Sequence, residues 1–477
     1  GMTRLELATS RPPDVCATNC ATSRSFVFCA LDFSFAMQRY DFILYSPNYF
    51  CNFARKIRKI LPVNVKKRIF APSILRAEIK LPASKSISNR ALVIRALSGG
   101  NDPIDNVSDC DDSSVVLEAL CSMPRVIDIK AAGTAMRFMT SLLATIAGEH
   151  IITGTERMRN RPIAVLVDAL RSLGADIEYG EKEGFPPLRI CGRELTGGRL
   201  SLPGNVSSQY ISSLLMIAPV LKQGLVLELT GEIISRPYID MTLAIMCDFG
   251  AKAQWVNERE IRVEPVPYSP IPYYIESDWS AASYWYEMVA LSQNDDAEVL
   301  LEGLFDNSLQ GDSAVAELFS SLGVETRFEG NAVRLSKKVP EAGAFVRNMV
   351  NQPDLAQTIV VTCCILGKPF RISGLQTLRI KETDRIAALQ NELAKLGFQI
   401  GVEGDDTLFW NGEDNVDTMS ADGIAIDTYE DHRMAMAFAP VALRRDSIII
   451  NNPAVVSKSY PMFWEDMQKA GFKLAQV

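Results

Sequence analysis

Positively charged residues stand where several helices of this sequence are expected to begin. Residues 84–90 (SKSISNR) lead into the apolar run ALVIRALSGG, and similar segments with a cation occur at 133–137, 161–162, 381–385 and 431–433. Residues 207–209 (SSQ) form a polar lead-in of the same kind without a cation. Lysine and arginine are unfavourable at a helix N-terminus, by about a few tenths of a kcal/mol, because that end of the helix dipole is already positive. A bound anion reverses this, because it accepts hydrogen bonds from the free backbone N–H groups and from the cations. The pattern therefore predicts sites for phosphate or carboxylate groups.

Lys381 and Arg385 lie four residues apart in RIKETDRI. If both are helical, they share one helix face and could bind one ligand together. A single lead-in of this kind could equally be a set of solvated surface charges. The recurrence of small polar residues and a cation before so many apolar runs favours a shared anion site.

The composition narrows the chemistry. The chain has 477 residues, 49 Lys and Arg against 57 Asp and Glu, and a formal net charge of −8, which argues against bulk binding to nucleic acid or a membrane surface. It has only two histidines, so a histidine dyad or metal cage is disfavoured and acid–base work falls to Asp, Glu and Lys. The ten cysteines form no CxxC pair, and the count fits a reducing compartment. No apolar run reaches the length of about 18 residues that a membrane helix needs.

The elements that must position these cations recur along the chain. An apolar residue, a glycine and an alternating stretch follow one another at Gly174, Gly250, Gly323, Gly397 and Gly471, with steps of 76, 73, 74 and 74 residues. Glycine is favoured after a helix where the backbone needs a positive φ, and the alternation after it is typical of a strand. The spacing predicts a repeated α/β unit.

Residues 67–477 have room for about six such units. The first copy is the weak one, because 117–129 (LEALCSMPRVIDI) has the helix and the strand but places Met123 and Pro124 where the glycine belongs. We expect residues 1–66 to be an N-terminal extension of unknown role. Glu6 and Asp14 disfavour a secretory peptide, and an organelle-type presequence or a partner-docking arm are the alternatives.

The motifs LPASKSISNRAL (81–92), AGTAMRF (132–138), RIKETDRI (379–386) and DHRMAM (431–436) together resemble those of the EPSP synthase family of enolpyruvyl transferases. The resemblance extends over about 67–477. It implies a two-domain, inside-out α/β fold with three βαβαββ units in each domain. One domain would comprise 67–82 plus 278–477, and the other 83–277, with helix N-termini converging on the cleft between them.

The resemblance also implies a reaction. The enolpyruvyl group of phosphoenolpyruvate would be transferred to the 5-hydroxyl of shikimate 3-phosphate, with release of phosphate, by addition and elimination through a tetrahedral ketal. It implies neither a metal nor a cofactor, and no nucleic-acid or membrane partner. We expect a cytoplasmic monomer that acts on two small molecules.

Site residues follow from the same resemblance. Shikimate 3-phosphate would contact Lys85, Ser86, Arg90, Ser207, Ser208, Gln209, Ser235, Asp354 and Lys381, with Tyr238 beside it. Phosphoenolpyruvate would contact Lys85, Gly133, Arg161, Gln209, Arg385, Arg433 and Lys458. Asp354 would be the base that takes the 5-hydroxyl proton, and Glu382, with Lys85 nearby, would move the proton at the enol methylene. Thr377 stands where the family often has asparagine, which leaves its contact with the substrate open.

Two alternative functions fit part of the pattern. The related transferase that acts on UDP-N-acetylglucosamine typically uses a loop cysteine as acid, but no cysteine lies between Cys121 and Cys191, where two of the motifs fall. A non-catalytic relative that binds polyanions would need the cations but not Asp354 and Glu382 beside them.

Overall fold

The computed structural model describes residues 65–413 and 423–477. The predicted N-terminal extension lies outside these residues, apart from its last two positions. Strand β1 (Lys66–Phe70) begins one residue before the predicted boundary and lies in a sheet between β21 (Ile448–Asn451) and β22 (Lys473–Gln476).

Two four-stranded sheets and their helices come from residues 126–263, each in the predicted order βαβαββ. The first unit contains β4 (Val126–Asp128), α5 (Gly133–Thr145), β5 (Gly148–Thr153), the short α6 (Glu156–Arg159), α7 (Ala164–Ser172), β6 (Asp176–Tyr179) and β7 (Leu188–Gly192). The second contains β8 (Gly198–Pro203), α8 (Ser208–Ile217), β9 (Leu225–Thr230), α9 (Arg236–Asp248), β10 (Ala253–Trp255) and β11 (Glu260–Val263). Within each unit the first two strands pair in parallel. The last strand of the unit, β7 or β11, pairs antiparallel with the second strand.

Three further four-stranded sheets have the same order. One combines β2 (Arg76–Lys80) with α10 (Trp279–Leu291), β13 (Glu298–Glu302), α11 (Val315–Ser320), β14 (Val324–Glu329) and β15 (Ala332–Lys337). The next contains β16 (Phe345–Asn348), α12 (Ala356–Ile365), β17 (Phe370–Ser373), α13 (Arg385–Lys395), β18 (Gly401–Glu403) and β19 (Thr407–Trp410). The last contains β20 (Ile424–Ile426), α14 (His432–Phe438), β21, α15 (Phe463–Lys469), β22 and β1.

The repeated glycines have the predicted backbone conformation. Gly174, Gly250, Gly323, Gly397 and Gly471 have φ of 100°, 87°, 95°, 95° and 92°, and each follows a helix. This confirms the inference that glycine is needed there because a Cβ disfavours positive φ.

The weak copy is incomplete in a way that the sequence did not reveal. Met123, at the end of α4 (Asp111–Ser122), has the left-handed φ of 37° in place of glycine. The strand after it, β4, pairs with β5 in the next sheet, so assigning that strand to the first copy was wrong. Within the described residues, this weak first copy has only the parallel pair β3 (Ile104–Asp105) and β12 (Tyr273–Tyr274), with α3 (Lys85–Ser98) and α4.

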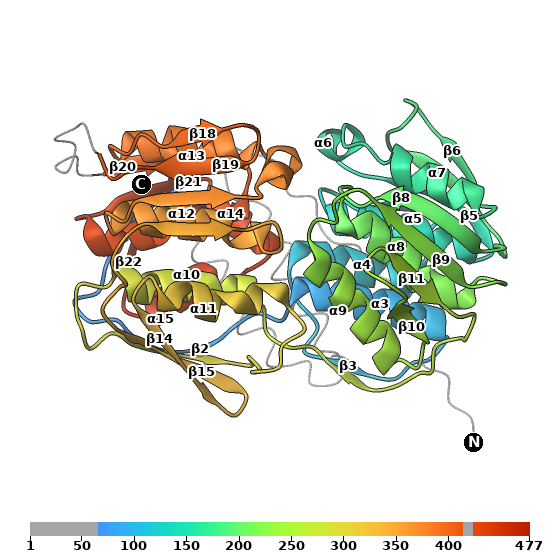
Figure 1. Ribbon diagram of the computed structural model, residues 1–477, viewed down its shortest axis with the longest axis horizontal. Coiled ribbons are helices and arrows are strands. Elements are labelled where there is room, and N and C mark those ends of the chain that lie inside the picture. The colour runs from blue at the N-terminus through green and yellow to red at the C-terminus, as the bar shows by residue number, and fades with distance from the viewer. Residues whose placement is uncertain (1–64, 414–422) are drawn as a thin grey trace, which may run out of the picture. The chain divides into compact units, whose positions relative to one another are not determined.

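Helices form the interior and sheets lie outside them. Helices α3, α5, α8 and α9 contact one another in one group, and α10, α12 and α14 do so in another, as Figure 1 shows. Helix α12 is buried along almost its whole length, which explains its apolar sequence on every side. Cys363 and Cys364 on this helix are buried.

The buried side chains form two clusters. One contains apolar residues from 83 to 275, and the other contains residues 69–81 together with 279–472. We propose that these cores correspond to the two domains expected above, 83–277 and 67–82 plus 278–477. The connections run side by side, because Ala83 and Ser277 form an antiparallel bridge. No helix of residues 65–413 and 423–477 has the length and apolar character needed to cross a membrane.

The paired connections place two helix starts together. The Asp278 carboxylate accepts a hydrogen bond from Ala281 N in the first turn of α10, at 3.1 Å, and one from Lys85 N at the start of α3, at 3.4 Å. One aspartate therefore caps both helices, and Lys85 and Ser280 are held within the same small region.

Candidate active site

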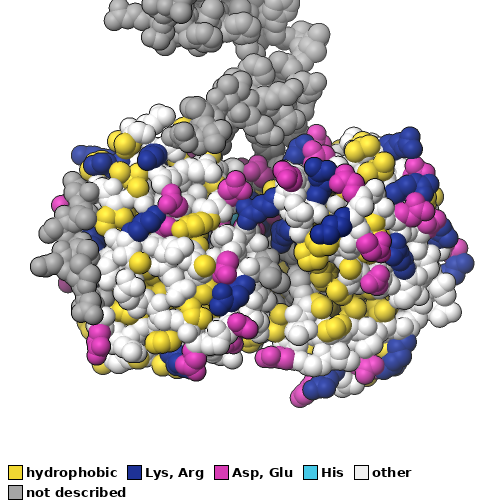
Figure 2. Space-filling view, turned by 90° about the horizontal axis from the view of Figure 1, so that it is seen from above, with side chains coloured by type: hydrophobic (Ala, Val, Ile, Leu, Met, Phe, Trp, Pro, Cys, Tyr) yellow, Lys and Arg dark blue, Asp and Glu magenta, His cyan; other side chains and the backbone are white. Residues whose placement is uncertain are grey.

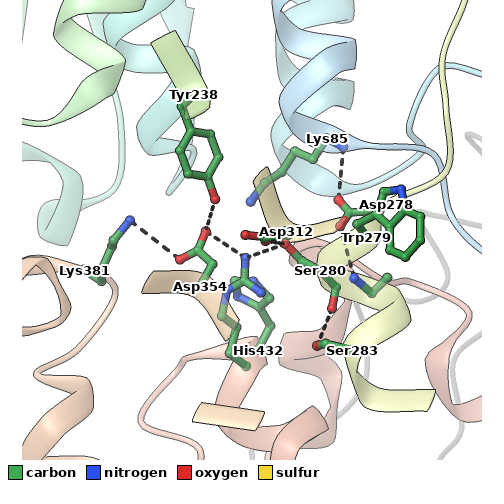
Figure 3. A network of polar contacts seen from close by, with 12 residues as sticks. Lys85, Tyr238, Asp278, Trp279, Ser280, Ser283, Asp312, Asp354, Lys381 and His432 are labelled. Carbon is green, nitrogen blue, oxygen red and sulfur yellow. Dashed lines mark hydrogen bonds and ion pairs between the residues drawn. The ribbon is translucent and has the colours of Figure 1, made fainter. Parts of the chain in front are cut away.

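Asp354 is the centre of a network of polar contacts (Figure 3). It lies in the 3₁₀ turn Pro353–Leu355, just before α12. Its Oδ1 is 3.1 Å from Arg385 Nη1 and 3.7 Å from Lys381 Nζ, and its Oδ2 is 2.9 Å from Arg433 Nη2. The Tyr238 hydroxyl donates to Oδ2 at 3.3 Å. Burial by itself would raise the pKa of Asp354, but the three cations hold it well below its usual range, so the carboxylate is ionised.

Glu382 is held in the same way. Its Oε1 is 2.9 Å from Lys458 Nζ, and its Oε2 is 2.9 Å from Arg385 Nη2. Burial opposes ionisation, but Arg385 and Lys458 keep the pKa of Glu382 well below its usual range. Arg385 is almost fully buried, and its Nε also donates to Asp431 Oδ2 at 2.7 Å. The two carboxylates that were predicted to act as acid and base thus share one counter-charge, Arg385.

Lys85 is next to this group. Its Nζ is 3.4 Å from Asp112 Oδ2, and the Asp112 and Glu382 charges raise the pKa of Lys85 although burial lowers it. Lys85, Ser86, Asp354 and Arg433 line one enclosed pocket. On the face in Figure 2, Lys and Arg side chains lie beside Asp and Glu side chains along the furrow across the middle.

Arg90 is buried without a counter-charge. Its guanidinium donates to Thr242 Oγ1 at 2.7 Å, Ser86 O at 2.8 Å, Ser212 Oγ at 3.1 Å and Tyr238 O at 3.3 Å. All these acceptors are neutral, and no carboxylate of the described residues lies within ion-pair distance. Burial lowers the pKa of Arg90 to about 10. Four of the five N–H donors of the guanidinium are used, so one donor and a whole positive charge are available to a ligand.

A second group of cations surrounds Gly133, the first residue of α5. Arg137 Nη1 donates to Gly133 O at 2.9 Å, and its guanidinium lies over the Tyr210 ring. Burial and the neighbouring Arg137 lower the pKa of Arg161 to about 10. Within the described part of the chain, neither arginine forms an ion pair. Two adjacent cations without carboxylates make this a site for an anion.

Gly133→Ala is expected to weaken this anion site without unfolding the protein. A Cβ at position 133 would lie 2.6 Å from Arg161 Nη1 and 3.0 Å from Arg137 Nη1, so both guanidiniums must move. These are ends of flexible side chains, and the helix start itself is not strained. We expect the KM for phosphoenolpyruvate to rise about tenfold and the melting temperature to change by less than about 3 °C, measured by steady-state kinetics and calorimetry. An unchanged KM would show that the ligand does not approach Gly133.

The predicted serine and glutamine residues stand at helix starts. Ser207 caps α8, where its hydroxyl accepts from Gln209 N, and Ser208 is the first residue of that helix. Gln209 Nε2 donates to Thr134 Oγ1 at 3.0 Å, which connects α8 to α5. Ser235 precedes α9 in a left-handed conformation with φ of 54°, and Tyr238 in the first turn of α9 reaches Asp354.

The family model that matches this sequence is EPSP synthase (3-phosphoshikimate 1-carboxyvinyltransferase), over residues 69–125 and 121–467. The chain belongs to the EPSP synthase family.

Curated relatives of this family cover most of the chain. A 3-phosphoshikimate 1-carboxyvinyltransferase of Bacteroides fragilis is 58% identical over 402 residues, which is 84% of this chain and 97% of the relative. Those of Colwellia psychrerythraea and Photobacterium damsela subsp. piscicida are 36% and 35% identical and cover 84% and 83% of this chain and 97% of each relative. A solved EPSP synthase from Acinetobacter baumannii has a TM-score of 0.69 at 20% identity, covering 86% of this chain and all of that one. The expected two-domain α/β fold of the family is confirmed.

One prediction about how this EPSP synthase-family site is built was wrong. Helix α13 begins at Arg385, because the Asp384 side chain caps it by accepting from Ala387 N at 3.1 Å. Lys381 therefore precedes the helix, and the two cations do not share a helix face. They still meet at Asp354 Oδ1, because the chain turns between them.

Several residues in the family site were not singled out from the sequence. They are Asp112, which pairs with Lys85; Asp431, which pairs with Arg385; Asp312; and His432, which is buried beside Lys85 and Glu382. Burial lowers the pKa of His432 well below its usual range, with the Lys85 and Arg433 charges adding to this, so the imidazole is neutral. A signal was present for the aspartates, since a buried lysine or arginine requires a carboxylate until its ligand binds. The Thr377 hydroxyl is buried and has no hydrogen-bond partner among the described residues, so its contact with substrate stays open.

Proposed function

We propose that this chain transfers the enolpyruvyl group of phosphoenolpyruvate to the 5-hydroxyl of shikimate 3-phosphate and releases phosphate. The observation that carries the proposal is the charge balance of the site. Arg90, Arg137 and Arg161 have no carboxylate partner within the described residues, whereas Asp354 and Glu382 have several cations each. Two reactants that together carry two phosphates and two carboxylates would neutralise the unpaired cations and compete for the shared ones.

The two reactants would occupy neighbouring parts of the site. Shikimate 3-phosphate would lie between the starts of α3, α8 and α9, in contact with Lys85, Ser86, Arg90, Ser207, Ser208, Gln209, Ser235, Asp354 and Lys381, with Tyr238 beside it. Phosphoenolpyruvate would lie between α5 and the starts of α13 and α14, in contact with Lys85, Gly133, Arg161, Gln209, Arg385, Arg433 and Lys458. Two hydrogen bonds support this arrangement. Gln209 at the start of α8 donates to Thr134, next to Gly133 on α5, and Tyr238 donates to Asp354, which also contacts Arg385 and Arg433.

In the addition step, the methylene carbon of phosphoenolpyruvate takes a proton while the 5-hydroxyl oxygen attacks the neighbouring carbon. Asp354 accepts the hydroxyl proton, and Glu382, with Lys85 nearby, takes up a proton as the reactants bind and donates it to the methylene. In the elimination step, the new methyl group of the tetrahedral ketal returns a proton to Glu382. The leaving phosphate takes the hydroxyl proton from Asp354, and the enol double bond is restored.

The low pKa values of Asp354 and Glu382 bear directly on these roles. A carboxylate held far below its usual pKa is ionised but is a weak base. Phosphate and carboxylate groups of the reactants would draw Arg385, Arg433 and Lys458 away from the two carboxylates. The pKa values of Asp354 and Glu382 would then rise, so that each becomes competent for proton transfer only when both reactants are bound.

We propose that the chain acts as a monomer in the cytoplasm. The test of the function is a phosphate-release assay with phosphoenolpyruvate and shikimate 3-phosphate. We expect turnover only when both are present. Turnover with UDP-N-acetylglucosamine in place of shikimate 3-phosphate would overturn the substrate assignment, and binding of both reactants without turnover would favour the non-catalytic alternative.

A further inference from the structure

A further carboxyl group, that of Asp312, is connected to Arg433 and has no role in the reaction scheme proposed above. Asp312, in the 3₁₀ turn Gly311–Ala314, is 4% exposed. Its Oδ2 accepts a hydrogen bond from the Ser280 hydroxyl, while its Oδ1 has no hydrogen-bond partner among the described residues. Figure 3 shows Asp312 and Ser280 together beside the Asp354 network.

Ser280 connects Asp312 to Arg433. Ser280 is the second residue of α10, and its Oγ lies 3.5 Å from Arg433 Nη2. The same guanidinium is 2.9 Å from Asp354 Oδ2 and 3.4 Å from the Tyr284 hydroxyl. Arg433 is thus held from three sides, and Asp312 provides one of them through the serine hydroxyl.

Contacts of the two preceding residues, Gln310 and Gly311, hold the turn that carries Asp312. Next to it, Gln310 Nε2 donates to Glu276 Oε2 at 2.7 Å and to Ser277 O at 2.8 Å. A Cβ on Gly311 would lie 2.5 Å from Cβ of Pro237, in the first turn of α9, so the turn packs closely there. A carboxyl on a turn held this firmly can define the position of another side chain.

We propose that Asp312, acting through Ser280, is a positioning residue that holds the Arg433 guanidinium where it meets both Asp354 and phosphoenolpyruvate. This inference rests on the proposed function for the identity of the ligand. It assigns no proton transfer with substrate to Asp312, which reaches Arg433 only through Ser280.

The charge of Asp312 gives the proposal a second consequence. The groups that face it are Asp354 from the turn before α12, Arg433 from α14, Asp278 from the cap of α10 and Tyr238 from α9. Burial and the neighbouring Asp354 charge raise the pKa of Asp312 to about 7, although Arg433 opposes this. Since an anion on Arg433 repels an ionised Asp312, phosphoenolpyruvate should bind best when Asp312 is protonated. Its KM should therefore rise as the pH increases through 7.

Three single variants and one double variant separate the positioning of Arg433 from the effect of the Asp312 charge. Asp312→Ala and Ser280→Ala each remove the connection to Arg433, so we expect the KM for phosphoenolpyruvate to rise about tenfold while kcat and the Kd of shikimate 3-phosphate change less than about threefold. The double variant should be no worse than either single one, because both residues act through one contact. Asp312→Asn keeps an acceptor for Ser280 but has no charge, so its KM should stay near the wild-type value at pH 6 and should not rise between pH 6 and 8.

Asp306→Ala is the matched control, since Asp306 is an exposed aspartate six residues earlier in the same connection. Calorimetric binding of phosphoenolpyruvate in the presence of shikimate 3-phosphate repeats the comparison without turnover. Failure of the wild-type protein to release phosphate would reject the proposed function, and the binding data would still test Asp312. If Asp312→Ala weakened the binding of phosphoenolpyruvate and of shikimate 3-phosphate equally and lowered the melting temperature, Asp312 would have a structural role only. This result would overturn the proposal. An unchanged KM for phosphoenolpyruvate in both alanine variants would overturn it as well.

Discussion

Asp354→Asn is expected to lower kcat by about 10²–10⁴-fold, the usual contribution of a well-placed acid or base. The asparagine has nearly the same shape and keeps one oxygen that accepts hydrogen bonds, but its NH2 group is a donor and it cannot take the proton of the 5-hydroxyl. Binding should be retained or become tighter, because Lys381, Arg385 and Arg433 lose a competing carboxylate. A large loss of kcat combined with equal or lower Kd values is the signature of a residue needed for proton transfer and not for binding.

The measurement is single-turnover kinetics together with calorimetric binding of shikimate 3-phosphate. Asp405→Asn, at an exposed turn between β18 and β19, is the matched control and should behave like the wild type. If Asp354→Asn kept kcat within about tenfold of the wild type, another group would be the base. If it lost binding, Asp354 would be an organiser of the cations instead.

The repeats of the fold could be predicted from the sequence because a particular backbone conformation at the end of a helix requires a particular residue. A helix that ends in a left-handed residue selects glycine at each copy, so Gly174 and Gly471 mark equivalent places almost three hundred residues apart. The first copy escaped this reasoning because Met123 adopts the same conformation without glycine. Which sheet a strand joins depends on pairing between distant segments, and nothing in the residues around β4 indicates that it pairs with β5.

The site could be predicted where a ligand has to balance charge. Cations at helix starts indicated anions, and the structure brings Lys85, Arg385 and Arg433 into one network. Two of the carboxylates that balance them, Asp112 and Asp431, were missed. Asp431 caps α14 through Arg433 N and could be explained by that local hydrogen bond alone, although it also binds Arg385. A cap residue and an ion-pair partner have the same sequence signature, so only the fold distinguishes them.

The start of α13 shows a local signal that was read incorrectly. Asp384 precedes the apolar run IAALQ and is a favoured cap residue, which sets the first helical residue at Arg385. Treating 381–385 as helical gave Lys381 a place on the helix. The prediction placed both cations on one ligand, whereas the structure places both at Asp354 Oδ1.

Arg90→Met is expected to raise the Kd of shikimate 3-phosphate by about 100-fold. The ligand would lose a hydrogen bond to a charged donor, which contributes up to about 3 kcal/mol, in a place where no other cation can replace it. Arg90 is 2% exposed and has only neutral acceptors within the described residues, so its charge is uncompensated until an anion arrives. Methionine fills a similar volume without that charge.

The same change should cost the free protein little. Removing a buried charge without a counter-charge relieves its desolvation, while the lost hydrogen bonds oppose this gain. Thr242 still donates to Tyr238 O at 2.7 Å, and its hydroxyl still contacts that of Ser212 at 2.8 Å, so three of the four former acceptors retain a partner. We therefore expect a melting temperature within a few degrees of the wild type.

Arg90→Lys provides the sharper comparison. Lysine keeps the charge but has three donors on one atom, which cannot reach acceptors arranged around a planar fork. It should therefore bind shikimate 3-phosphate more weakly than the wild type and also be less stable than Arg90→Met, because a buried charge would remain with fewer hydrogen bonds. Arg95→Met, on the last turn of the same helix α3, is the control and should leave binding unchanged. Calorimetry on the three variants decides the question: a Kd for Arg90→Met within about threefold of the wild type would show that the uncompensated charge of Arg90 is not used by the substrate.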